Sequence, residues 1–97
     1  MLGLSINKVS GDSMSPTIET NSYVLLHNFG TKKHLKKGQI VNVEHDEFGT
    51  IIKRIAYQDK NGLYWLVGDD PKSLACCQIG PVSATQITGI LFCNLGY

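Results

Sequence analysis

Short runs of apolar and β-branched residues alternate with polar turn sequences along the chain. Runs of valine, isoleucine and aromatic residues bounded by glycine, asparagine or aspartate are typical of β-strands. Five such runs occur, at residues 23–29, 39–45, 50–57, 63–68 and 87–95. The turn sequences "HDEFG" (45–49) and "DKNG" (59–62) separate neighbouring runs, and the Asn-Gly pair in the second is a strong hairpin signal.

Helical periodicity is weak throughout the sequence. Only residues 15–19 and 83–87 have a serine placed to cap a single helical turn. A further strand is expected ahead of the polar turn at residues 10–16. With 97 residues and no repeat, low-complexity tract or linker, the chain has the length of one domain. The pattern therefore predicts a single mainly β domain over residues 1–97, with about six strands.

The composition excludes several classes of partner. A net charge of +1 favours neither nucleic acid nor an anionic membrane as a direct partner. The basic run "KKHLKK" (32–37) lacks interleaved aromatic residues, so we expect it to be a solvated loop. No apolar run approaches the roughly 18 residues of a membrane span. The start "MLGLSINKV" also lacks the basic residues that begin a signal peptide.

The three cysteines, Cys76, Cys77 and Cys93, are an odd number, and two of them are adjacent. Adjacent cysteines bridge each other only with strain, which argues against a secreted disulfide framework. The histidines lie far from the cysteines in sequence, which argues against a shared metal site. We therefore predict reduced, partly buried thiols, no metal and a cytoplasmic location.

The turn "GDSMSP" (11–16) raises the question of a nucleophile, because it contains two serines. A serine becomes a nucleophile only when a base accepts its proton and hydrogen-bond donors hold the oxyanion. The histidines form no evident Ser-His-Asp set, so the candidate base is a lysine that is neutral at the working pH. Burial favours the neutral amine and so lowers the pKa of a lysine.

Lys53 lies within the run at residues 50–57. Alternate residues of a strand share a face, so Lys53 is expected to lie with the apolar Ile51, Ile55 and Tyr57, while Arg54 lies on the opposite face. We therefore predict a lowered pKa for Lys53. Taken alone, a lysine in an alternating strand is more often an edge residue whose stem covers apolar surface.

Three motifs in order carry a family resemblance. "SGDSMSPTI" (10–18), followed by "TIIKRI" (50–55), resembles the Ser-Lys peptidases of the LexA-type, UmuD-type and type I signal peptidase superfamily. Their hallmarks are Gly-x-Ser-Met, often with proline three residues after the serine, and a Lys-Arg or Lys-Lys pair within a strand. "WLVGDDPKS" (65–73) is similar to the Gly-Asp-Asn-rich box of the signal peptidases. The resemblance extends from about Val9 to Leu95 and implies a LexA/signal-peptidase-like bent β-sheet domain.

The same resemblance implies roles for individual residues. Ser13 would be the nucleophile, and Lys53 the general base that later returns the proton to the leaving amine. Gly11 and Asp12 would contribute to the oxyanion site or orient the catalytic groups, and Ser73 would orient Lys53. The rival serine is two residues after Ser13, and the Ser-Met pair favours Ser13.

These residues lead to three hypotheses about function. The first is a soluble serine endopeptidase that cleaves a protein substrate after small residues, without metal or cofactor. The alternative is a non-enzymatic, UmuD'-like regulatory or polymerase-accessory domain that acts through protein–protein contacts, with a homodimer as the expected assembly. The third is an unrelated small β-module in which Ser13 and Lys53 never meet. Only twelve residues precede Ser13 and the chain has no Ala-Gly pair, so we expect hydrolysis in trans without self-processing.

Overall fold

The architecture is an antiparallel β-sheet. The structure is a computed structural model that describes residues 3–9, 11, 14–28, 35–71 and 76–96, without the side chains of residues 76 and 77. These residues contain the strands β1 (Leu4–Lys8), β2 (Tyr23–His27), β3 (Ile40–His45), β4 (Gly49–Gln58), β5 (Tyr64–Val67) and β6 (Ile87–Gly96). The order across the sheet is β1-β2-β6-β3-β4-β5, and all described neighbours are antiparallel. The predicted mainly β fold is confirmed.

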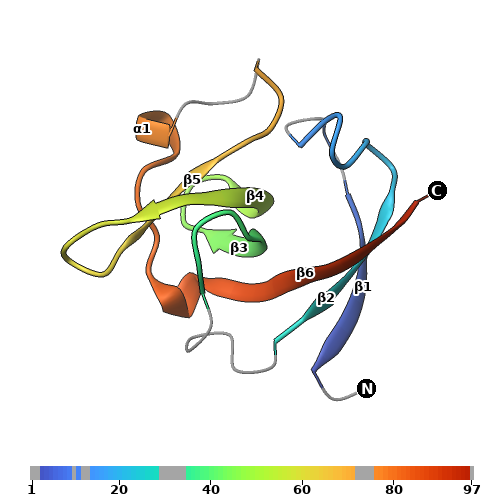
Figure 1. Cartoon of the computed structure of the whole chain (residues 1–97), viewed down its shortest axis with the longest axis horizontal. Coiled ribbons are helices and arrows are strands. Elements are labelled where there is room, and N and C mark those ends of the chain that lie inside the picture. The colour runs from blue at the N-terminus through green and yellow to red at the C-terminus, as the bar shows by residue number, and fades with distance from the viewer. Residues whose placement is uncertain (1–2, 10, 12–13, 29–34, 72–75, 97) are drawn as a thin grey trace.

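The sheet is strongly curved (Figure 1). Strand β6 crosses the molecule, with β2 hydrogen-bonded along one side and β3 along the other (Figure 1). Its pairings with both neighbours contain register shifts, and so does the pairing of β4 with β5. Such bulges bend and twist the strands that contain them. Strand β6, the last in the sequence, lies between β2 and β3 and so joins the β1-β2 part of the sheet to the β3-β4-β5 part.

Both predicted hairpin turns are confirmed. Gly49, which ends the turn between β3 and β4, has φ +73°, a value that suits glycine. In the turn between β4 and β5, the Asp59 carboxylate accepts hydrogen bonds from the N–H of Asn61 and of Leu63 over 2.9 and 3.0 Å. It also accepts one from Trp65 Nε1 over 2.9 Å. The aspartate that opens "DKNG" thus fixes the turn through its side chain.

Two short helices complete the described chain. The capped turn predicted at residues 83–87 is confirmed as the 3₁₀ helix η1 (Ala84–Gln86), where the Ser83 N–H donates to Gln86 Oε1 over 2.9 Å. The four-residue helix α1 (Cys76–Ile79) was not predicted, because so short a segment has no periodicity to detect. It lies beside β5 (Figure 1), and Ile79 is buried.

Buried apolar side chains of the described residues form two clusters. The first cluster contains Val41, Val43, Ile55, Tyr64, Leu66, Ile79, Val82, Ile87 and Ile90. The second contains Val9, Met14, Ile18, Val24, Leu26 and Ile40. Successive residues of a strand point to opposite faces, which is why Ile40 and Val41 of β3 belong to different clusters. The second cluster includes Val9, which precedes the polar turn at 10–16, and Ile18, which follows it.

Candidate active site

The predicted site residues are only partly within the described chain. Gly11 and Lys53 are described, whereas Asp12, Ser13 and Ser73 lie outside the described residues. The description of the site therefore rests on the segments before and after Ser13 and on the strand that carries Lys53.

The loop that contains Ser13 is attached to the core on both sides of the serine. Before it, the Val9 N–H donates to the carbonyl of Ser22 over 2.8 Å. After it, Met14 and Ile18 are each only 1% exposed, and the Ile18 N–H donates to the Met14 carbonyl over 2.8 Å. Burying a side chain of this size stabilises the fold by about 2 kcal/mol. These two anchors restrict where the loop lies relative to the sheet.

Gly11 adopts a backbone conformation that only glycine takes readily. Its φ is +82°, in the left-handed region that L side chains rarely occupy. The chain therefore requires glycine two residues before Ser13 for the path of the backbone, as the sequence motif suggested.

Lys53 is a buried lysine. It pairs with Val41 across β3 and β4, and the residue is 6% exposed. Within the described part of the chain, its amine makes no hydrogen bond or ion pair. Burial without a compensating carboxylate lowers the pKa of Lys53 from its usual 10.5. The expected cause, desolvation, is the one that operates.

One of the walls predicted for Lys53 is absent. Ile51 is half-buried and Ile55 is buried, as expected, but Tyr57 is 47% exposed. A register shift between Ile55 and Tyr57 breaks the alternation of the strand, so that Tyr57 leaves the face that it would share with Lys53. Its ring stacks instead on Trp65, with the ring centroids 6.0 Å apart.

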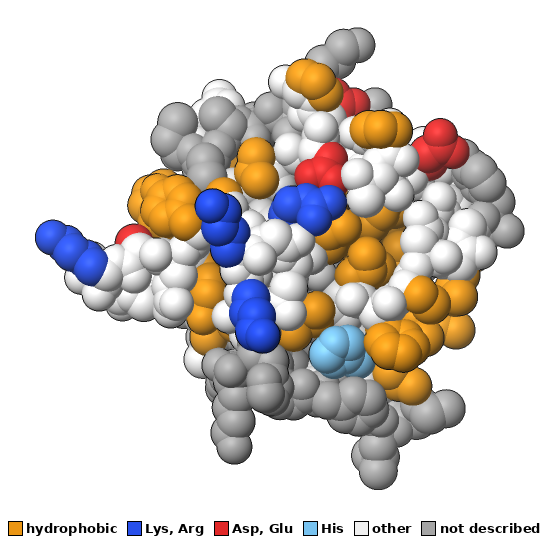
Figure 2. Space-filling view, in the orientation of Figure 1, with side chains coloured by type: hydrophobic (Ala, Val, Ile, Leu, Met, Phe, Trp, Pro, Cys, Tyr) orange, Lys and Arg blue, Asp and Glu red, His pale blue; other side chains and the backbone are white. Residues whose placement is uncertain are grey.

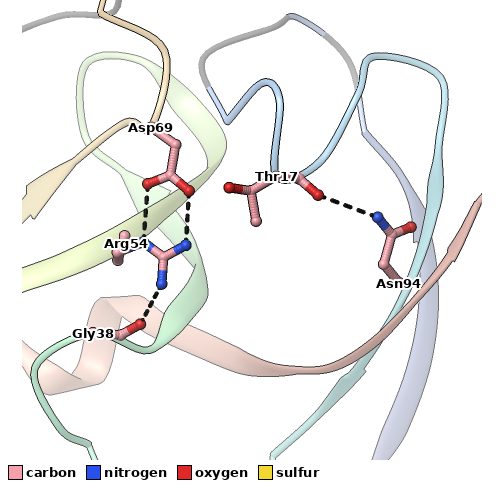
Figure 3. Close-up of polar contacts among 5 residues, drawn as sticks. All are labelled: Thr17, Gly38, Arg54, Asp69 and Asn94. Atoms are coloured by element: carbon pink, nitrogen blue, oxygen red, sulfur yellow. Dashed lines mark hydrogen bonds and ion pairs between the residues drawn. The ribbon is translucent and has the colours of Figure 1, made fainter.

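Arg54, the next residue, is held by a carboxylate from another segment. Its Nε and Nη2 donate to the two oxygens of Asp69 over 2.9 and 2.7 Å, and its Nη1 donates to the carbonyl of Gly38 over 2.7 Å (Figure 3). The hydrogen bond to Asp69 raises the pKa of Arg54. The hydrogen bond from Arg54 lowers the pKa of Asp69, with a smaller contribution from the Thr17 side chain.

The Arg54–Asp69 pair lies beside the loop of the candidate nucleophile (Figure 3). Thr17, four residues after Ser13, lies across from Asp69, and its carbonyl accepts a hydrogen bond from Asn94 Nδ2 over 3.4 Å. All three resemblance motifs thus meet here through Thr17, Arg54 and Asp69. The sequence showed the acidic segment "GDD" (68–70) as part of a motif. It did not show that Asp69 contacts Arg54, because the two residues are 15 positions apart.

A cleft of about 730 Å³ lies next to Lys53. One wall is the segment from Ile6 to Val9, which runs toward the loop, together with Val24. The other wall comes from β3 and β4 and comprises Asn42, Glu44, Phe48, Thr50, Ile51, Ile52 and Lys53. The structure therefore brings Lys53 and the strand that leads toward Ser13 to the same cleft.

Other classes of site receive no support from the described residues. Among them, no three His, Cys, Asp or Glu side chains form a group that could hold a metal ion. On the face in Figure 2, basic side chains are interspersed with hydrophobic and uncharged ones. Cys93 is a free, half-buried thiol, as predicted. Across the part of the chain that the structure describes, no helix has the length and apolar character needed to cross a membrane.

Comparison with known proteins adds a family assignment. A family model described as Peptidase S24-like matches residues 4–92, which is nearly the whole chain. The matched range includes the loop of Ser13, the strand of Lys53 and both walls of the cleft. No curated protein matches the sequence.

Proposed function

The chain belongs to the Peptidase S24-like family, and we propose that it is a serine endopeptidase with Ser13 as nucleophile and Lys53 as general base. The observation that carries the proposal is the setting of Lys53, a lysine 6% exposed, whose amine has no ion pair among the described residues. A lysine acts as a base only when its amine is neutral, and burial lowers the pKa of Lys53 in that direction.

The proposed reaction follows from this pair of groups. The neutral amine of Lys53 accepts the proton of the Ser13 hydroxyl while Oγ attacks the carbonyl carbon of the scissile bond. Backbone N–H groups of Ser13 and of the Gly11–Asp12 segment would stabilise the oxyanion. The Lys53 ammonium then gives its proton to the leaving amine, and the C–N bond breaks. Water, deprotonated by Lys53, hydrolyses the acyl-enzyme in the same manner. No metal or cofactor takes part.

The cleft supports an extended peptide as substrate. β1 is at the edge of the sheet and pairs with β2 alone among the described strands, so its other edge has backbone groups available to a further strand. Residues of this strand line the cleft opposite Lys53. A peptide that adds beside β1 would therefore pass Lys53. Within the family resemblance, small residues such as alanine would flank the scissile bond.

Further parts of the proposal concern Ser73 and the cellular compartment. Ser73 is proposed to orient Lys53 through a hydrogen bond. A reducing compartment such as the cytoplasm fits the odd number of cysteines.

The proposal is tested with a set of short peptides that contain a central Ala-Ala pair in varied flanking sequences. Cleavage by the wild-type protein is followed by mass spectrometry and compared with Ser13→Ala and Lys53→Met. Cleavage by the wild type alone is the expected result. Cleavage that survives in Ser13→Ala, or its absence from all peptides with the wild type, would contradict the proposed activity.

A further inference from the structure

The cleft continues beyond Lys53 to a region that the proposed chemistry does not use. Its lining includes Glu44 and Phe48, both exposed, from the turn region between β3 and β4. Glu44 pairs with Thr50 across the two strands. Thr50 precedes Lys53 by three positions on β4, which corresponds to roughly 10 Å along an extended strand. This odd separation places the side chains of Thr50 and Lys53 on opposite faces of the strand, but both residues line the cleft, so one peptide bound along the cleft can reach both places.

The Glu44 carboxylate is fixed in direction. The Thr50 hydroxyl lies 2.9 Å from Oε1 and 2.8 Å from Oε2 and donates its one proton to this carboxylate. A carboxylate has about four acceptor positions, so most of them stay available to a ligand. Because the hydroxyl donor is neutral, the negative charge of Glu44 is not compensated by it.

Phe48 is held at the rim of the cleft by His45. His45 Nδ1 accepts hydrogen bonds from the N–H of Glu47 and of Phe48 over 3.0 and 3.1 Å. Its Nε2 lies 2.8 Å from the carbonyl of Ile79, which makes Nε2 the donor and Nδ1 the acceptor. The rings of His45 and Phe48 are in contact, with centroids 4.9 Å apart. The turn therefore presents an ordered aromatic ring, 42% exposed, beside a carboxylate.

The described lining of the cleft contains one acidic residue and two basic residues. Glu44 is the acidic residue among them, and the basic residues are Lys53 and Lys8, the latter on the β1 wall. An aromatic face beside a carboxylate suits a Lys or Arg side chain, whose apolar stem packs on the ring while its charge pairs with the acid.

We infer that Glu44 and Phe48 form a specificity subsite for a cationic side chain of the substrate, about three residues from the scissile bond. This inference rests on the proposed peptidase function, because it takes the scissile bond to lie beside Lys53. An exposed ion pair together with a cation–π contact corresponds to a preference of about fivefold for Lys over Glu at that substrate position.

The test uses the Ala-Ala peptides with one Lys, Glu or Gln placed in turn at each position on either side of the pair. Binding to Ser13→Ala is measured by fluorescence anisotropy, and cleavage by the wild type is measured as kcat/KM. Glu44→Gln removes the charge, and Glu44→Lys reverses it. Glu47→Gln is the matched control, since Glu47 lies in the same turn, is exposed and is not among the lining residues.

We expect the preference for Lys at one position near the third residue, its loss in Glu44→Gln, its inversion in Glu44→Lys and its retention in Glu47→Gln. Equal binding of the Lys and Glu peptides at every position, or a preference that Glu44→Gln leaves unchanged, would overturn the subsite. Absence of binding to any peptide would overturn it as well. Selective binding without cleavage by the wild type would instead contradict the peptidase function and leave the subsite standing. Cleavage by the wild type without a preference for Lys would contradict the subsite and leave the peptidase function standing.

Discussion

Lys53 and Arg54 are neighbours in β4, and the two faces of the strand give them opposite surroundings. Lys53 is buried, its amine has no ion pair among the described residues, and its pKa is lowered by desolvation. Arg54 has the Asp69 carboxylate in bidentate contact, and the hydrogen bond to Asp69 raises its pKa. Burial alone lowers the pKa of a basic side chain, whereas a hydrogen-bonded carboxylate raises it.

This difference is what the proposed function requires of the two side chains. A base that works by accepting a proton must be able to exist in the neutral form, which the Lys53 side of the strand favours. A side chain that holds two segments together by an ion pair must keep its charge. The hydrogen bond to Asp69 favours the charged form of Arg54. Under the proposed function, Lys53 and Arg54 would therefore have different roles, Lys53 as the base and Arg54 in holding segments together.

The largest effect is expected for Lys53→Met. The substitution removes the proposed base but retains a chain of similar volume, so cleavage should fall by about 10³-fold or more. The folded state should be kept and should gain about 1 kcal/mol of unfolding free energy, because the cost of burying an amine is removed. Peptide cleavage and thermal unfolding measure the two effects. Lys36→Met, at an exposed lysine, is the control. A Lys53→Met protein with wild-type activity would refute the assignment of Lys53 as base.

A smaller effect is expected for Asp69→Asn. The variant weakens the contact that holds Arg54 beside the loop of Ser13, so we expect a loss of about 1 kcal/mol of unfolding free energy, since the pair is partly exposed. Cleavage should fall by about tenfold through displacement of the loop. Asp46→Asn, at an exposed aspartate in the β3–β4 turn, should change neither quantity. If both variants behaved alike, the Arg54 side of β4 would have no positioning role.

Much of this account could be predicted from sequence, and the parts that could not are those that depend on distant residues. Strand positions and both hairpin turns follow from local alternation and from residues such as Asp59 and Gly49. The burial of Lys53 follows from the same alternation. The exposure of Tyr57 does not, because a bulge in β4 arises from its pairing with β5. The contact between Arg54 and Asp69 was equally hidden, since the sheet order and the path after β5 decide it.

The pH dependence of stability should differ between the two sides. For Asp69, whose pKa is lowered below 3.8, the unfolded state binds more protons as the pH falls, so stability decreases below about pH 3.8. For Lys53, whose pKa is lowered below 10.5, the unfolded state binds more protons between the folded value and 10.5, so stability increases with pH across that window.

Chemical denaturation at a series of pH values measures both slopes. Asp69→Asn should reduce the acid slope and leave the alkaline one unchanged, whereas Lys53→Met should reduce the alkaline slope and leave the acid one unchanged. An alkaline slope that persists in Lys53→Met would assign it to another group.

The last prediction is that the intact mass of the chain does not change. β1 is paired with β2 from Leu4 to Lys8, and a segment that folded back into the cleft would give up these backbone hydrogen bonds. We therefore predict that residues 1–97 are not self-processed during long incubation at mildly alkaline pH. Loss of an N-terminal fragment in the wild type, but not in Ser13→Ala, would show that the chain cleaves itself.

The most direct test of the central claim is an NMR titration of the Lys53 side chain in wild-type protein with ¹³C-labelled lysine, assigned by comparison with Lys53→Met. The account predicts that Lys53 loses its proton at a pH below 10.5. A Lys53 that stays protonated up to pH 10.5 would contradict the account, because a permanently charged ammonium cannot accept the proton of Ser13.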